Sequence, residues 1–112
     1  MLSPQEESQL SSIFSILDAN WEKPEFSGED FSRSMAMSVS QLYRTAVKLT
    51  GQPPNTLLKQ FRLEKAKGMM KKKLYSVSQV TFDSGFTSPS YFTKCFKKEY
   101  GLLPLEYLRL ID

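Results

Sequence analysis

The sequence predicts an all-α fold of about seven helices, built as two similar halves joined by a long connecting helix. Apolar residues recur at the three- and four-residue spacing of helices, and no segment alternates in the way a strand does. Serine, glycine and proline stand where helices begin and end. The second half also repeats the first at an offset of 50 residues. A chain of 112 residues suits one domain, or two very small subdomains.

The repeat can be followed position by position. The matched pairs include Ser38/Ser88, Ser40/Ser90, Leu42/Phe92, Arg44/Lys94, Ala46/Phe96, Lys48/Lys98, Gly51/Gly101, Pro54/Pro104 and Leu58/Leu108. Such a period is typical of one supersecondary unit that is built twice.

The first half begins with an expected helix over Gln5–Trp21, preceded by a frayed Met1–Pro4. Its apolar side chains follow the helical period. Ser27 can cap a short helix over Gly28–Met35, whose first turn is acidic.

A third helix follows after a tight turn. Ser38 and Gln41 have the spacing of a capping box, in which each residue bonds the backbone of the other. This helix runs to about Leu49, and Gly51 supplies the left-handed residue that ends it.

The connecting helix is expected over residues 55–73, a stretch without proline. Eighteen helical residues span about 27 Å, so this helix is expected to hold the two copies as a rigid connector.

The second copy follows the same order. Its helices are expected at Ser76–Phe82, Pro89–Tyr100 and Pro104–Ile111. Gly85 lies where the turn needs positive φ, Ser88 caps the middle helix, and Gly101 ends it.

Charge is divided unevenly along the chain. Residues 1–30 carry seven acids against one lysine, whereas the other 82 residues carry fourteen lysines and arginines against five acids. The basic part suggests a polyanionic partner, most simply nucleic acid. A solvated lysine surface is the alternative.

The second helix of each copy has one apolar side and one side of small, hydroxylic and basic residues. The apolar sides comprise Leu42, Ala46 and Leu49 in the first copy and Phe92, Cys95, Phe96 and Tyr100 in the second. The opposite sides comprise Ser40, Tyr43, Arg44, Val47 and Lys48, and Ser90, Thr93, Lys94, Lys97 and Lys98. This is the helix-turn-helix arrangement, whose second helix enters the major groove of DNA.

Simpler interpretations remain for single residues. Arg44 could be an ordinary surface cation, and Tyr43 could be half-buried at a module interface. Residues 71–73 suit a solvated helix end, and Cys95 suits a buried core position.

Two stretches resemble the DNA-binding region of the AraC/XylS family of bacterial transcription regulators. They are SGFTSPSYFTKCFKKEYGLLPLEYLR (Ser84–Arg109) and MSVSQLYRTAVKLTGQPPNTLLKQFRLEKA (Met37–Ala66). The resemblance implies two homeodomain-like helix-turn-helix units that read successive major-groove segments on one face of DNA. It implies a DNA-binding domain over 26–112, made of 26–54, 55–73 and 74–112, after an acidic helix and lead-in over 1–25.

The resemblance also assigns site residues. Ser40, Tyr43 and Arg44 match the base- and backbone-facing positions of the first recognition helix, and Pro89, Ser90, Thr93 and Lys94 match those of the second. Together with the basic side chains on the same faces, the predicted DNA-binding residues are Ser40, Tyr43, Arg44, Lys48, Pro89, Ser90, Thr93, Lys94 and Lys97.

The sequence departs from the family pattern at four positions. Ser32 and Thr81 replace alanine, so their hydroxyls must bond back to the preceding turn. Ala36 replaces a turn glycine, and Leu103 replaces the serine that caps the last helix.

The function expected is that of a sequence-specific transcription regulator. The chain is expected to be the output domain of a larger two-component or ligand-sensing protein, with a small free-standing regulator as the alternative. Its expected partners are double-stranded DNA, RNA polymerase, and a sensor or dimerisation domain elsewhere in the parent chain. A helical protein–protein interaction module with basic faces is the alternative.

Other classes of function are disfavoured. The chain has no histidine and one cysteine, so an enzyme with a His-based triad, a His-containing zinc site or a thiolate cage is not expected. No cofactor, metal or membrane contact is expected, and the expected location is the cytoplasm.

Overall fold

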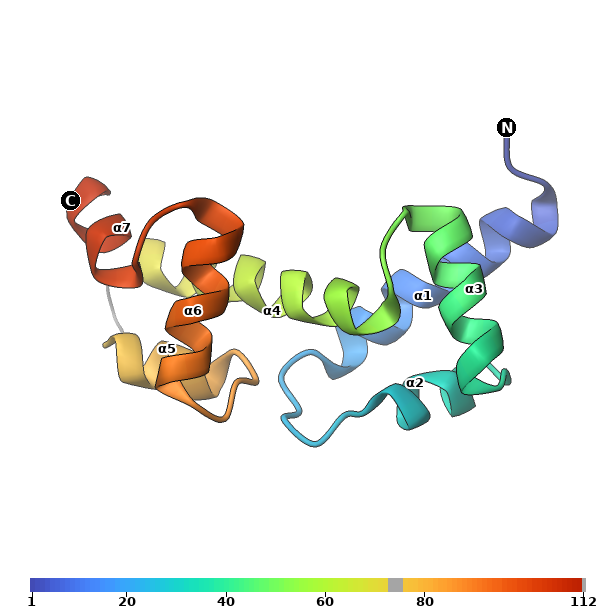
Figure 1. The fold of residues 1–112 in the computed structure, drawn as a ribbon, viewed down its shortest axis with the longest axis horizontal. Coiled ribbons are helices and arrows are strands. Elements are labelled where there is room, and N and C mark those ends of the chain that lie inside the picture. The colour runs from blue at the N-terminus through green and yellow to red at the C-terminus, as the bar shows by residue number, and fades with distance from the viewer. Residues whose placement is uncertain (73–75, 112) are drawn as a thin grey trace. The chain divides into compact units, whose positions relative to one another are not determined.

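A computed structural model describes residues 1–72 and 76–111, which form seven α-helices and no strand (Figure 1). The helices are α1 (Pro4–Asn20), α2 (Gly28–Ser34), α3 (Val39–Thr50), α4 (Pro54–Lys71), α5 (Val77–Asp83), α6 (Pro89–Tyr100) and α7 (Pro104–Leu110). The predicted all-α class is confirmed. Helix α6 has the predicted bounds, and the other described helix ends lie within two residues of the predictions. The predicted end of the connecting helix at Lys73 lies outside the described residues.

The chain divides into two compact units, unit 1 over Met1–Lys59 and unit 2 over Gln60–Asp112. The division falls inside α4, whose first residues therefore belong to unit 1 and whose later turns belong to unit 2.

Unit 1 packs α3 against both α1 and α2. Its fully or almost fully buried apolar side chains are Ile13, Leu17, Phe31, Leu42, Ala46, Leu57 and Leu58. Burying a large aliphatic or aromatic side chain contributes about 1.5–3 kcal/mol, so this shared core fixes the orientation of α3.

The start of α1 differs from the prediction. Met1–Pro4 was expected to be frayed, but the Ser3 Oγ accepts a hydrogen bond from the Glu6 amide at 3.1 Å, and Pro4 is the first helical residue. The Glu6 Oε1 in turn accepts from the Ser3 amide at 3.0 Å. This reciprocal pair satisfies two amides that the first turn leaves open, and so extends the helix toward the N-terminus.

Unit 2 is held together by an apolar cluster around α6. The cluster comprises Leu63, Ala66, Met70, Val80, Phe86, Phe92, Cys95 and Phe96. Aromatic rings follow one another through it, with centroids 5.2 Å apart for Phe86 and Phe92 and 5.8 Å apart for Phe92 and Phe96. The predicted burial of Cys95 is confirmed.

The turn before each recognition helix has the same construction. The Met37 amide bonds the Ser32 carbonyl at 2.9 Å, and the Phe86 amide bonds the Thr81 carbonyl at 3.1 Å. Each bond closes a Schellman motif, which needs a left-handed residue just past the helix end. Gly85 takes this position at φ 94°, whereas Ala36 takes it at φ 55°, at a cost of about 1–2 kcal/mol.

The Ser32 and Thr81 hydroxyls, which were predicted to hydrogen-bond to the preceding helical turn, do so. The Ser32 Oγ donates to the Glu29 carbonyl at 2.8 Å, and the Thr81 Oγ1 donates to the Val77 carbonyl at 2.9 Å. Both residues are buried, so these bonds remove the penalty of an unsatisfied hydroxyl in each core.

Candidate nucleic-acid interface

Helix α3 is defined sharply at both ends. The Ser38 Oγ accepts from the Gln41 amide at 3.1 Å, and the Gln41 Oε1 accepts from the Ser38 amide at 2.9 Å. Gly51, at φ 80°, ends the helix in the left-handed conformation. The capping box predicted from sequence is thus confirmed. The Gln41 side chain is used in this cap, because its Oε1 accepts from the Ser38 amide.

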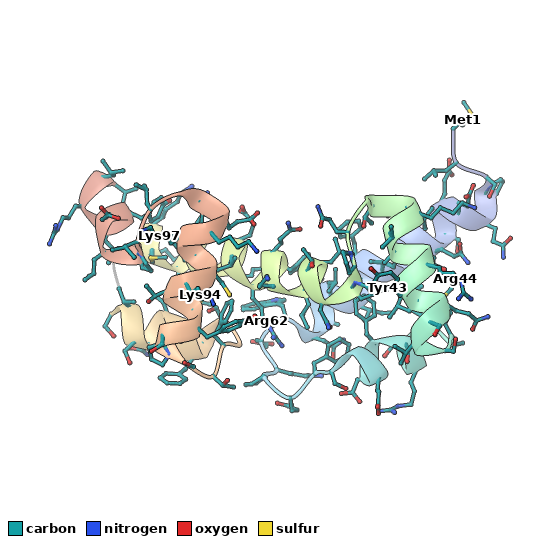
Figure 2. All side chains as sticks on the ribbon, viewed as in Figure 1. Met1, Tyr43, Arg44, Arg62, Lys94 and Lys97 are labelled. Carbon is teal, nitrogen blue, oxygen red and sulfur yellow. The ribbon has the colours of Figure 1, made fainter. Side chains whose placement is uncertain are left out.

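Helix α3 carries Ser40, Tyr43 and Arg44, all of which are exposed. Tyr43 and Arg44 are labelled in Figure 2. Tyr43 is 53% exposed, although it is a large aromatic residue. Arg44 makes no ion pair with any other residue that the structure describes. These three side chains are therefore available to a partner at the N-terminal and middle part of the helix.

Helix α6 presents a similar surface in unit 2. Pro89, Ser90, Lys94 and Lys97 are exposed, with Lys94 and Lys97 labelled in Figure 2. Thr93 is partly buried, so it is less accessible than its place on the helical wheel indicates.

The cap of α6 differs from that of α3. The Ser88 Oγ accepts from the Tyr91 amide at 3.3 Å, but a tyrosine at this position has no carboxyl or amide group to return the bond. The Tyr91 side chain stays exposed instead. Hydrogen bonding to the Cys95 thiol raises the pKa of the Tyr91 hydroxyl above its usual value, so it stays neutral.

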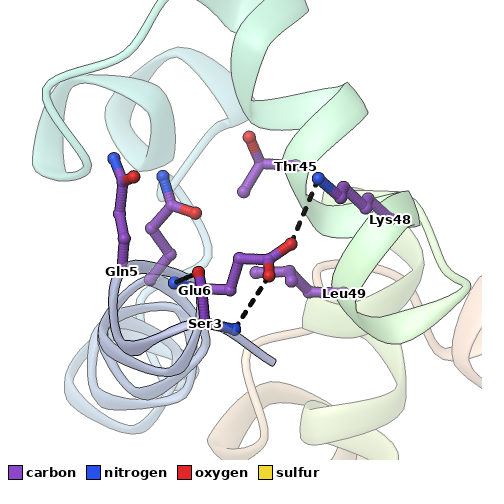
Figure 3. Close-up of a pocket in the computed structure, with 7 residues that line it drawn as sticks. Ser3, Gln5, Glu6, Thr45, Lys48 and Leu49 are labelled. Carbon is purple, nitrogen blue, oxygen red and sulfur yellow. Dashed lines mark hydrogen bonds and ion pairs between the residues drawn. The ribbon is translucent and has the colours of Figure 1, made fainter. Parts of the chain in front are cut away.

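Lys48, the remaining predicted site residue, makes an ion pair within the fold. Its Nζ lies 3.1 Å from the Glu6 Oε2, so the side chain reaches from α3 to the first turn of α1 (Figure 3). Ser3, Gln5, Gln9, Thr45 and Leu49 line an open pocket together with this pair. The sequence does not predict this contact of Glu6; the only local signal is the Ser3–Glu6 capping-box spacing.

The Glu6 carboxylate is strongly stabilised in its charged form. The hydrogen bond from the Ser3 backbone is the largest cause, followed by that from the Lys48 side chain. With smaller contributions from the Ser3 hydroxyl and the Lys48 charge, they lower the pKa of Glu6 from 4.5 to about 2. Glu6 therefore remains ionised throughout the physiological pH range.

This pKa predicts an acid-dependent loss of stability in unit 1. A lowered folded-state pKa stabilises the fold above the unfolded pKa near 4.5, and that contribution disappears as pH falls toward 2. The melting midpoint of the parent should therefore decline between pH 5 and pH 2 more steeply than that of Glu6→Gln. Thermal melts followed by Trp21 fluorescence measure this, because the single tryptophan lies in unit 1.

Glu7→Gln is the matched control for that experiment. Glu7 is an exposed acid in the same helical turn. If the two variants and the parent decline in parallel, the Glu6 carboxylate does not contribute as described.

Two other features, a metal-ligand cluster and a membrane-spanning helix, are not found among the described residues. Within residues 1–72 and 76–111, no three histidine, cysteine or acidic side chains gather as metal ligands would. Over the same ranges, no helix combines the length and apolar character needed to span a membrane.

Comparison with known proteins connects this arrangement to a family. A protein-family model with the description helix-turn-helix domain matches residues 31–110 of the chain. The match runs from α2 to the last residue of α7 and includes both helix-turn-helix units.

Individual relatives agree with that match. A protein named histidine kinase P4 from Formosa agariphila is 29% identical over 106 residues, which are 95% of this chain and 8% of the kinase. The transcriptional activator RhaS from Mannheimia succiniciproducens is 32% identical over 80% of this chain and 33% of its own length. The chain thus spans a small part of one relative and a third of the other.

A solved structure carries the same fold. The DNA-binding domain of AdpA, described as a global transcriptional factor in complex with a target DNA, has a TM-score of 0.84 to this chain. The two are 25% identical, and the alignment covers 90% of each chain. The paired helix-turn-helix units, the family match and these relatives lead to one conclusion: the chain belongs to the helix-turn-helix family of AraC/XylS-type DNA-binding domains.

Proposed function

We propose that this chain binds duplex DNA sequence-specifically and regulates transcription as the output domain of a larger regulator. One observation carries the proposal: each unit presents an exposed, hydroxylic and basic face on the second helix of a helix-turn-helix. Short side chains near the helix N-terminus allow close approach to the major groove, and the cations that follow can reach guanine edges or phosphates.

The site residues take different roles in this proposal. Arg44 and Lys94, which the repeat places at equivalent positions, are proposed to contact base edges or phosphates. Ser40, Tyr43, Ser90 and Thr93 are proposed to line the groove around them, and Pro89 to set the start of α6. Lys97 is proposed as a phosphate contact.

The relatives support a place in signal transduction. The match to a segment of a histidine kinase fits an output domain that is fused to or controlled by a two-component sensor. RNA polymerase and a sensor or dimerisation domain are accordingly proposed as further partners.

Selection from random duplex DNA, followed by hydroxyl-radical footprinting, tests the proposal. Two working units should protect two successive major-groove segments on one face of the selected site, about 34 Å apart. An 18-residue helix spans about 27 Å, which is shorter than the distance of about 34 Å between successive groove entries. If the connecting helix sets the spacing of the two contacts, as expected from the sequence, the DNA should bend modestly, at a cost of order 1–6 kcal/mol. Circular-permutation mobility measures the bend.

Two results would count against this proposal. Protection of a single groove segment without a bend would leave only one working unit. Binding to an acidic protein that unrelated duplex DNA cannot displace would favour a protein-interaction module, because attraction to the DNA backbone gives at least weak, salt-sensitive binding.

A further inference from the structure

The ion pair between α1 and α3 connects the acidic first helix to a predicted recognition helix. We propose that Glu6 occupies Lys48 in place of a DNA phosphate, so that α1 lowers the affinity of α3 for the duplex. This inference rests on the proposed function, because it concerns the same DNA-binding face.

The position of Lys48 makes it a natural phosphate contact. It lies one helical turn after Arg44 on α3, and residues four apart lie on the same side of a helix. Its side chain is 72% exposed, so the ammonium is accessible to a phosphate from solvent. A phosphate would need the same charge that the Glu6 carboxylate engages at 3.1 Å.

Glu6 is well placed to retain the lysine. Its Oε1 accepts from the Ser3 amide at 3.0 Å, which leaves its Oε2 directed at Lys48 (Figure 3). The carboxylate side chain is only 24% exposed and remains charged at neutral pH. The competition therefore depends on salt and on DNA rather than on physiological changes of pH.

The second unit provides an internal comparison. Lys98 matches Lys48 in the 50-residue repeat and is exposed on α6. Within the described part of the chain, Lys98 makes no ion pair. One of two equivalent cations is therefore engaged by an acid, while the other is open to a phosphate.

The expected change in DNA affinity is modest. Exposed ion pairs are weak, so releasing Lys48 should raise the affinity for a selected duplex only about two- to fivefold. The salt dependence is a sharper measure, because each added phosphate contact steepens the plot of log K against log salt by about 0.9.

The experiment measures fluorescence anisotropy of a labelled, selected duplex with the whole chain at several salt concentrations. Glu6→Gln is the central variant, since glutamine keeps the capping box while it removes the charge. Glu7→Gln is the matched control, because it removes one charge from the same turn without contacting Lys48. Thermal melts at neutral pH check that both variants are folded.

Four results are expected together. Glu6→Gln should bind more tightly than Glu7→Gln and with the steeper salt dependence. The difference in affinity between Glu6→Gln and Glu7→Gln should vanish when each substitution is combined with Lys48→Gln. In the otherwise unchanged chain, Lys98→Gln should weaken binding more than Lys48→Gln does.

Other results overturn the inference. If Glu6→Gln binds like Glu7→Gln, the pair does not restrain Lys48; if it binds more weakly, Glu6 positions Lys48 for DNA instead. Either result leaves the proposed function intact, provided that the parent binds its selected duplex. If the parent selects no duplex, the proposed function itself fails, and this inference fails with it.

Discussion

Phe96→Ala is expected to lower the free energy of unfolding by about 3–5 kcal/mol, the loss typical of truncating a buried phenylalanine. Phe96 is 0% exposed. Its ring contacts Phe92, Tyr100 and Tyr107 at centroid distances of 5.8, 4.8 and 5.7 Å. Removing it leaves a cavity where α6 meets α7, and aromatic pairs add about 0.5–1.5 kcal/mol beyond the area they bury.

The expected loss of unfolding free energy is large for a unit of this size. About 50 residues sustain roughly 3–8 kcal/mol of stability, so the variant should leave unit 2 marginal or unfolded at room temperature. Its melting midpoint, followed by far-UV circular dichroism, should fall by at least about 12 °C.

Phe82→Ala is the control for that measurement. Phe82 lies in the same unit but is 49% exposed, and its truncation should cost about 1 kcal/mol or less. A midpoint for Phe96→Ala within a few degrees of the parent would mean that α6 buries its other face.

Arg44→Ala and Lys94→Ala should each weaken binding to a selected duplex by about 1–3 kcal/mol, which is roughly 5- to 150-fold. Both side chains are exposed on their recognition helices and lack an ion pair within the described residues. Their removal should therefore leave helical content and melting midpoint unchanged, because nothing in the folded core depends on them.

Comparing the affinities of each variant for the selected duplex and for an unrelated duplex separates two roles for these residues. Loss of a base contact reduces discrimination at one position of the site, whereas loss of a phosphate contact weakens binding to all sequences alike. Lys71→Ala is the control, since Lys71 is an exposed cation at the end of α4. Parent-like affinity in both test variants would remove Arg44 and Lys94 from the interface.

Much of the fold follows from local signals. Ser38 with Gln41 begins α3, Pro89 begins α6, and Gly51 with Gly101 ends them, because each of these motifs satisfies backbone groups within a few residues. The spacing of Phe92 and Phe96 identifies the buried side of α6 for a similarly local reason, since it depends only on helical periodicity.

Some positions that share a helical face could not be distinguished in this way. Thr93 and Lys94 are neighbours on α6, yet one is partly buried and the other exposed. Periodicity assigns a residue to a side of its helix, but the exposure within that side depends on neighbouring elements. The start of α1 could have been found, because Ser3, Pro4 and Glu6 together form a complete N-terminal signal.

The sequence by itself determined the all-α class, the duplicated helix-turn-helix order and the exposure of Arg44 and Lys94. Each of these depends on contacts within one helix or on the repeat. Only the tertiary structure decided that Lys48, predicted as one more DNA contact, lies 3.1 Å from Glu6. The two residues are 42 positions apart, and they meet because the apolar faces of α1 and α3 pack together around Ile13, Leu17 and Leu42. No local pattern encodes such a pair, because it depends on how two separate helices pack against each other.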